Sequence, residues 1–207
     1  GINFKKKDFG LPDNSFVLAA FHQTYKISLK EVKSWARILL NSPSTILWIS
    51  DMAETPKRNL LSQFNKHGII SEKIYFAKRV ESYEEHLSRH SCADLFVDTF
   101  NFNAASTALD SLWAGLPVVT LLGKGFPARV AGSLLNSLNL KELIALDVQM
   151  YEEIIINLSR HPNQLLMINK KLIESKLNNK ISDISLYTKQ LEKIYLSTIN
   201  KINLNYE

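Results

Sequence analysis

The sequence predicts an α/β protein built on a doubly wound, parallel, Rossmann-like sheet, with a helical carboxyl-terminal end. Short, continuously apolar runs, typical of strands buried on both faces of a parallel sheet, recur over about residues 10–150. Longer segments with apolar residues at helical spacing lie between these runs. Beyond Tyr151 the pattern is wholly helical. We therefore expect one lobe over 1–207, with the sheet in 10–150 and helices in 151–207.

Local signals place the elements of the first half. Ser28 with Glu31, and Ser82 with Glu85, have the spacing of capping boxes and mark two helix starts, whereas Gly68 marks a helix end. The elements expected in order are a strand at 15–21, a helix from 28 to about 43, a strand at 45–49, a helix at 57–67, a strand at 73–77 and a helix from 82 to about 90.

The second half begins with a short apolar run, Leu95 to Val97, which reads as a buried strand. A polar turn follows it and leads into a helix in which Leu109, Leu112 and Trp113 share one face. The elements expected after that helix are a strand at 116–122, a helix at 126–138, a short strand at 143–146 and a terminal amphipathic helix at 187–199.

Ser106 and Thr107 stand at the start of the helix that follows this buried strand. A helix N-terminus has unpaired N–H groups and the positive end of the helix dipole, so small hydroxyl residues there can seat a phosphate. The alternative is plain capping, with Thr107 at the helix cap and Asp110 three residues later. The residues at this turn alone do not decide between the two interpretations.

Composition excludes several classes of protein. No apolar run approaches the ~20 residues that a membrane span needs, and the first residues lack a secretory pattern. Because the chain begins without Met, we expect it to start inside a longer protein. Its single cysteine, Cys92, cannot form an internal disulfide and fits the reducing cytoplasm. The sequence therefore predicts a cytoplasmic protein.

The net charge of +5 invites a nucleic-acid interpretation, but the basic excess lies at the two ends. Residues 1–9 hold three lysines against one aspartate, and residues 160–207 hold eight basic against four acidic residues. The segment between them is slightly acidic, without a stripe of Lys and Arg interleaved with aromatic residues. We therefore expect no nucleic-acid partner.

Motifs for common cofactors are absent from the sequence. It has no Gly-x-Gly-x-x-Gly segment and no phosphate loop of the ATPase type. The five histidines and one cysteine have no ligand spacing, and the nearest pair, His86 and His90, has no partner motif. We therefore expect no metal site and no bound cofactor.

Polar residues that follow strand ends are the remaining candidates, because a doubly wound sheet binds its ligand at that edge. Lys26 supplies a mobile charge suited to phosphate, with Gln23 as a donor beside it. Tyr83 can stack on a base, and His86, three residues later, lies on the same side of the helix. Arg129 is either an extra cation or, as we prefer, a structural contact for its helix.

Three blocks of sequence support a more specific interpretation. They are FHQTYKI at 21–27, FNFNAASTALDSLWAGLPVVT at 100–120 and ARVAGSLL at 128–135. In this order they closely resemble the carboxyl-terminal lobe of the O-GlcNAc transferase and Spindly-like glycosyltransferases. The resemblance covers most of the chain. It implies the nucleotide-binding lobe of a two-lobed glycosyltransferase of the GT-B fold.

The resemblance also implies a role for each candidate residue. Gln23 and Lys26 match residues that contact the diphosphate of a nucleotide sugar, and Lys26 matches a position essential for activity. His86 matches the residue that packs on the base and ribose, and Tyr83 replaces the more common Lys as a substitute for stacking. At the last loop, Ser106 and Thr107 match residues that contact the phosphates, and Asp110 matches a residue that accepts from the ribose hydroxyls. Ala105 stands where the family often has His.

The implied function is transfer of a sugar from UDP-GlcNAc, or a similar UDP- or GDP-sugar, to a protein Ser/Thr hydroxyl. The resemblance implies direct displacement with inversion, without a metal ion. It also implies a second, catalytic and acceptor-binding lobe and tetratricopeptide (TPR) repeats elsewhere in the protein, so this lobe alone should bind nucleotide without turnover. Two alternatives remain: a degenerate nucleotide- or protein-binding module, and a lobe of another nucleotide-sugar enzyme such as an epimerase or lipopolysaccharide transferase.

Overall fold

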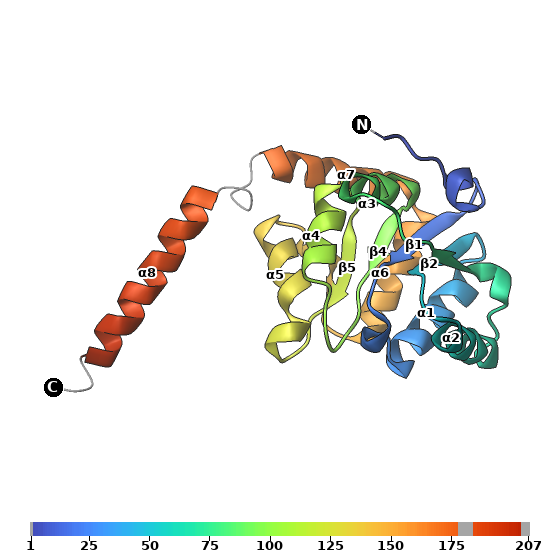
Figure 1. Cartoon of the computed structure of the whole chain (residues 1–207), viewed down its shortest axis with the longest axis horizontal. Coiled ribbons are helices and arrows are strands. Elements are labelled where there is room, and N and C mark those ends of the chain that lie inside the picture. The colour runs from blue at the N-terminus through green and yellow to red at the C-terminus, as the bar shows by residue number, and fades with distance from the viewer. Residues whose placement is uncertain (1, 178–183, 204–207) are drawn as a thin grey trace.

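The computed structural model describes residues 2–177 and 184–203, and a six-stranded parallel sheet forms its centre (Figure 1). The spatial order of the strands is β3-β2-β1-β4-β5-β6. This order reverses between β1 and β4, which is the topological switch point of a doubly wound fold, and the predicted fold class is confirmed. The strands are Phe16–Ala20 (β1), Thr45–Ser50 (β2), Ile74–Ala77 (β3), Leu95–Val97 (β4), Val118–Leu121 (β5) and Ile144–Ala145 (β6).

Helices cover both faces of the sheet. Because crossovers between parallel strands are right-handed, the connections toward β3 lie on one face and those toward β6 on the other. Accordingly α1 packs against α2 and α6, whereas α4 packs against α3 and α5. The helices of this body are Leu29–Asn41 (α1), Glu54–Lys66 (α2), Tyr83–Ser88 (α3), Ser106–Trp113 (α4), Val130–Ser137 (α5) and Val148–Arg160 (α6).

The core lies between the sheet and these helices. Its largest fully buried side chains include Trp35, Trp48, Phe64, Phe96 and Tyr151. Burying a large apolar side chain stabilises a fold by about 1.5–3 kcal/mol, so these residues and the aliphatic strand residues supply most of the driving force for folding. The tyrosine and one tryptophan are also joined, because the indole N–H of Trp35 donates to the Tyr151 hydroxyl at 3.3 Å.

Two predicted helix boundaries are wrong. Helix α2 begins at Glu54, three residues before the predicted start. The predicted helix at 126–138 is a 3-10 turn, Phe126–Ala128, followed by α5, because the backbone at Arg129 (φ −127°, ψ −6°) departs from helical geometry. The turn is fixed to the end of β5 by a hydrogen bond from Gly123 N to Ala128 O at 2.8 Å.

The carboxyl-terminal part is helical, as predicted, in the residues that the structure describes. Helix α7 spans Pro162–Leu177 and helix α8 spans Ile184–Asn203, which includes the predicted segment 187–199; residues 178–183 and 204–207 lie outside the described part. Figure 1 shows α8 standing apart from the sheet and its helices. Among the described helices, none has the length and apolar content that crossing a bilayer requires.

Candidate functional site

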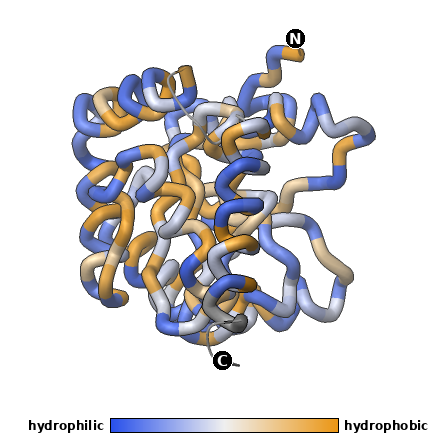
Figure 2. The backbone as a smooth tube through the Cα atoms, turned by 90° about the vertical axis from the view of Figure 1, so that its left-hand side faces the viewer, coloured by the Kyte–Doolittle hydropathy of each residue, from blue (hydrophilic) through white to orange (hydrophobic). Residues whose placement is uncertain are grey.

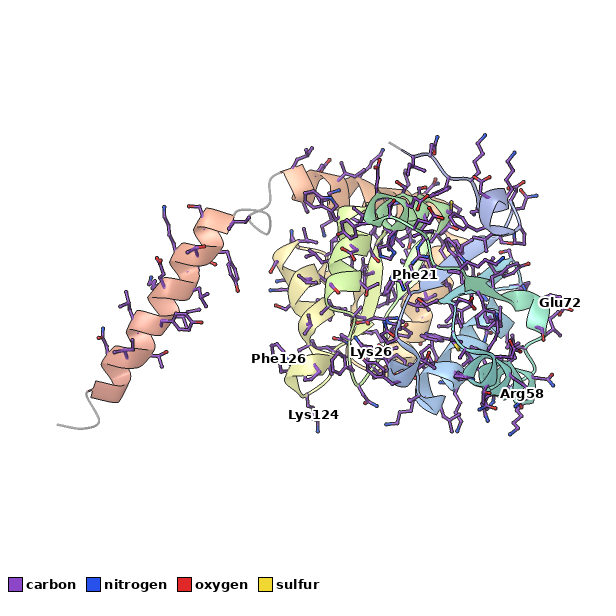
Figure 3. The ribbon with its side chains drawn as sticks, in the orientation of Figure 1. Phe21, Lys26, Arg58, Glu72, Lys124 and Phe126 are labelled. Carbon is purple, nitrogen blue, oxygen red and sulfur yellow. The ribbon has the colours of Figure 1, made fainter. Side chains whose placement is uncertain are left out.

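The switch point brings the loop that carries two predicted site residues close to the loop that leads into α4. Gln23 and Lys26 follow β1, and the loop 98–105 follows β4 and leads into α4. The Lys26 ammonium donates to the Asn103 carbonyl at 3.1 Å and lies over the Phe102 ring, 4.2 Å from its centroid. Lys26 and Phe126 both lie in the lower part of the body in Figure 3. The predicted lysine is thus held directly beside the start of α4.

Asp98, the first residue after β4, holds the loop 98–105 in place through hydrogen bonds to its carboxylate. One carboxylate oxygen accepts from the backbone N–H groups of Thr99 at 2.8 Å and Ala104 at 2.7 Å. The other accepts from the Thr120 hydroxyl at 2.7 Å. Desolvation by complete burial raises the pKa of Asp98 to about 7, although these hydrogen bonds and the charge of Lys26 oppose the rise. The loop therefore closes tightly around one buried carboxyl group.

Glu31 joins the two loops to each other. Its carboxylate completes the predicted capping box of α1 by accepting from Ser28 N at 2.8 Å. Its other oxygen accepts from Phe100 N, in the loop after β4, at 2.9 Å. Glu31 is fully buried, and a buried carboxylate with these bonds is costly to displace. The loop that carries Lys26 and the loop before α4 therefore form one rigid support.

The start of α4 has hydrogen-bond donors that no described side chain occupies. The residue before the helix is Ala105, which has no side-chain cap. Thr107 is the second residue of α4 rather than its cap, so the capping alternative for Thr107 and Asp110 is wrong. Within the described parts of the chain, the side chains of Ser106 and Thr107 make no hydrogen bonds. The first-turn N–H groups and these two hydroxyls thus remain available as donors.

On the other side of α4, Asp110 meets the residues of α3. The Tyr83 hydroxyl donates to one Asp110 oxygen at 2.6 Å, and His86 Nε2 lies 3.6 Å from the other. The Asp110 side chain retains 18% of its exposure, and that of His86 retains 22%. The three residues that the sequence assigns to base and ribose therefore lie together, with Asp110 already occupied by Tyr83.

Arg89 sets the orientation of His86 and was missed by the sequence analysis. Its guanidinium stacks on the Phe21 ring at 4.3 Å and donates to His86 Nδ1 at 2.8 Å. Because Arg can only donate, Nδ1 must be the acceptor and the imidazole proton must be on Nε2, which faces Asp110. Desolvation, and then the charge of Arg89, lower the pKa of His86, so its neutral form is favoured. The sequence signal that could have identified Arg89 is its position three residues after His86, about one helical turn further along.

The remaining candidates differ in their surroundings. Gln23 is exposed, and its side chain has no hydrogen-bond partner among the described residues. Arg129 donates to the Gly123 carbonyl at 2.9 Å, in agreement with the structural contact preferred from the sequence. Desolvation lowers the pKa of Lys26, and the charge of Asp98 opposes this shift. In the segments 2–177 and 184–203, no group of three His, Cys, Asp or Glu side chains is placed to hold a metal ion.

Two buried histidines lie directly behind the site. His22 Nε2 donates to the Val97 carbonyl at 2.8 Å, and His90 Nδ1 donates to the His86 carbonyl at 2.7 Å. Desolvation is the main cause that lowers the pKa of each to about 4. Both side chains are therefore neutral in the folded protein near neutral pH.

These groups predict how stability depends on pH. Between pH 5 and 6.5 the unfolded chain binds more protons than the folded chain at His22 and His90, so folding stability rises with pH there. Asp98, with its raised pKa, acts in the opposite direction over the same range. For these three groups the net rise is about 1 kcal/mol per pH unit near pH 5, and it becomes smaller toward pH 6.5, where the histidines of the unfolded chain are half deprotonated.

Urea unfolding of the chain at several pH values would measure this slope. His90→Gln removes one of the two favourable groups and should make stability nearly independent of pH between 5 and 6.5. A slope that His90→Gln leaves unchanged would contradict the assignment.

Comparison with known proteins adds to this geometry. The family model of glycosyl transferase family 41 matches this chain over residues 2–191. A probable UDP-N-acetylglucosamine–peptide N-acetylglucosaminyltransferase SEC of Arabidopsis thaliana is 32% identical over 95% of this chain. The UDP-N-acetylglucosamine–peptide N-acetylglucosaminyltransferase of Caenorhabditis elegans is 30% identical over 91% of it. The chain spans only 20% and 16% of the lengths of these two relatives.

Solved structures show the same architecture. A variant of Thermobaculum terrenum O-GlcNAc transferase superposes with a TM-score of 0.83 and 26% identity, over 88% of this chain and 36% of that one. A variant of Staphylococcus aureus TarM superposes with a TM-score of 0.63 at 12% identity, over 86% of this chain and 35% of that one, which supports the fold alone. The fold is therefore that of one lobe of a GT-B glycosyltransferase. The match over residues 2–191, together with these relatives, establishes that the chain belongs to glycosyl transferase family 41.

Proposed function

We propose that this chain is the nucleotide-sugar-binding lobe of an inverting protein O-glycosyltransferase that uses UDP-GlcNAc or a closely similar donor. Family membership and the names of the curated relatives support this class of reaction. The observation that carries the proposal for this chain is the arrangement at the switch point. There Lys26 stands beside the uncapped start of α4, and the pair His86 and Asp110 lies one helical turn further along.

In this proposal the diphosphate lies between Lys26 and the first turn of α4. Lys26, the first-turn N–H groups and the hydroxyls of Ser106 and Thr107 stabilise the negative charge that develops on the leaving diphosphate. Gln23 donates beside Lys26. These residues supply the electrostatic work usually given to a metal ion, and we propose that none is required.

The base and ribose lie toward α3. Asp110 accepts hydrogen bonds from the ribose hydroxyls, and the neutral imidazole of His86 packs on the nucleoside. Arg89 keeps that imidazole in a single tautomer and orientation through its bond to Nδ1. A base for the acceptor hydroxyl would come from a second lobe, so this lobe binds the donor and does not turn over alone. The proposed partners are therefore the UDP-sugar, that second lobe with its TPR repeats and a cytoplasmic protein acceptor.

A second candidate function is nucleotide or protein binding without catalysis. It is favoured by the hydrogen bond between Tyr83 and Asp110, which occupies the proposed ribose acceptor. Ala105, where the resembling family often has His, also removes one donor near the phosphates. Glycosyl transfer by a longer protein that contains this chain would decide against this alternative.

We expect UDP to bind the chain with a Kd of roughly 10 μM to 1 mM, because one side of the cleft supplies all the contacts. The affinity should fall as salt is added, since the diphosphate is recognised by charge. Calorimetric titration with UDP, GDP, UDP-GlcNAc and GDP-sugars measures this directly. Tight binding of GDP without binding of UDP would overturn the choice of base, and no binding of any of the four would reject the proposed function.

A further inference from the structure

Tyr83 is the residue of the site whose contact does not fit a simple stacking role. Its hydroxyl is 2.6 Å from an Asp110 oxygen, which is a short, charge-assisted hydrogen bond. The bond to Asp110 raises the pKa of the Tyr83 hydroxyl, so the hydroxyl keeps its proton and remains a donor. The side chain of Tyr83 therefore spans from α3 to α4 across the proposed nucleoside position.

The other surroundings of Asp110 leave little room for a second donor. His86 Nε2, which carries the imidazole proton, faces the second carboxylate oxygen at 3.6 Å. Both oxygens thus already face a protein donor, and the Asp110 side chain is only 18% exposed. A pair of ribose hydroxyls that binds this carboxylate must take the place of at least the Tyr83 hydroxyl.

Tyr83 is also free to leave. It is 64% exposed and is the first residue of α3, a helix of only six residues. Apart from Asp110, its one ring contact within the described part of the chain is a loose one with His86, with 6.2 Å between the ring centroids. Swinging the side chain into water therefore sacrifices one exposed hydrogen bond and little packing.

We propose that Tyr83 gates Asp110, and that its hydroxyl must be displaced before the ribose of a nucleotide can bind. The proposal rests on the proposed function, because it concerns the same nucleotide site. The closed form lowers the apparent affinity for ribose-containing ligands by the fraction of molecules that are open. A ligand that contacts only Lys26 and the start of α4 is not affected by the gate.

Tyr83→Phe is the matched variant, because it removes the hydroxyl and keeps the ring. Calorimetric titration of the unaltered chain and of the variant would use two ligands, UDP and inorganic pyrophosphate, which has no ribose. We expect Tyr83→Phe to tighten UDP by about 3- to 10-fold, the size expected for one exposed charge-assisted hydrogen bond, and to leave pyrophosphate unchanged. In an Asp110→Ala background the same substitution should have no effect on UDP.

Other outcomes separate the gate from the function itself. If UDP binds the unaltered chain and Tyr83→Phe leaves its affinity unchanged or weakens it, the gate is wrong and the proposed function stands. Equal tightening of UDP and pyrophosphate would also reject the gate, because the effect would then lie outside the ribose position. If neither protein binds UDP, both the gate and the proposed function are rejected.

Discussion

Lys26→Ala is expected to weaken UDP binding about 10- to 150-fold while leaving the binding of uridine nearly unchanged. The lost interaction is a charge-assisted hydrogen bond to the diphosphate, worth about 1.5–3 kcal/mol when partly screened from water. Lys26 is a good candidate for so large an effect because Asn103 and Phe102 already hold its ammonium beside the first turn of α4. Little side-chain entropy is then lost when the phosphate binds.

Lys124→Ala provides the matched control, since Lys124 is an exposed lysine in the neighbouring loop after β5. It removes the same charge from the same region of the protein. We expect it to change the affinity for UDP only slightly, without a specific effect on any one phosphate. Thermal unfolding of both variants would show that each is folded. If Lys26→Ala weakened uridine as much as UDP, the substitution would have damaged the loop, and the phosphate role would be wrong.

Much of the fold could be predicted because its signals are local. The runs at 15–21 and 45–49 are continuously apolar, and both are buried strands of the sheet. The capping boxes of Ser28 with Glu31 and of Ser82 with Glu85 are both formed, so each marks the start of its helix as predicted. Such local signals do not give the order of the strands in the sheet. The alternation of strands and helices nevertheless indicates a parallel sheet.

The supports of the site could not be predicted, because they depend on contacts between distant segments. Asp98 is one acidic residue after a strand until the fold brings Thr120 and Ala104 to its carboxylate. Glu31 was expected only as part of a capping box, yet it also holds Phe100, 69 residues further along the chain. The Tyr83–Asp110 contact likewise joins two helices, and no spacing in the sequence indicates it.

Among the described residues, helix α8 has an exposed apolar face. Ile184, Tyr187 and Ile194 recur at helical spacing and keep 78%, 63% and 58% of their exposure. Figure 2, seen from the side of α8, shows hydrophobic and hydrophilic segments alternating along this helix. An apolar face that stays in water does not stabilise an isolated helix. Exposed apolar surface of this kind marks an interaction site. We propose that the second lobe of the longer protein covers it.

Removing residues 186–207 should therefore affect the isolated lobe little and a longer protein with both lobes strongly. The shortened lobe is expected to lose less than about 1 kcal/mol of unfolding free energy, since α8 covers none of the core clustered around the sheet. A longer protein with both lobes should lose most of its glycosyl transfer from UDP-GlcNAc, because the contact between the lobes is removed. Thermal unfolding of the lobe and a transfer assay on the longer protein measure the two effects.

Point variants separate loss of the face from loss of the helix. In the longer protein, Tyr187→Ser with Ile194→Ser should reduce transfer strongly, whereas Lys189→Ala, on the opposite side of α8, should leave it nearly unchanged. Neither change touches the sheet, so UDP affinity of the lobe should stay the same in both. An unfolded or insoluble shortened lobe would show instead that α8 belongs to the core of this lobe, and the proposed interface would then be wrong.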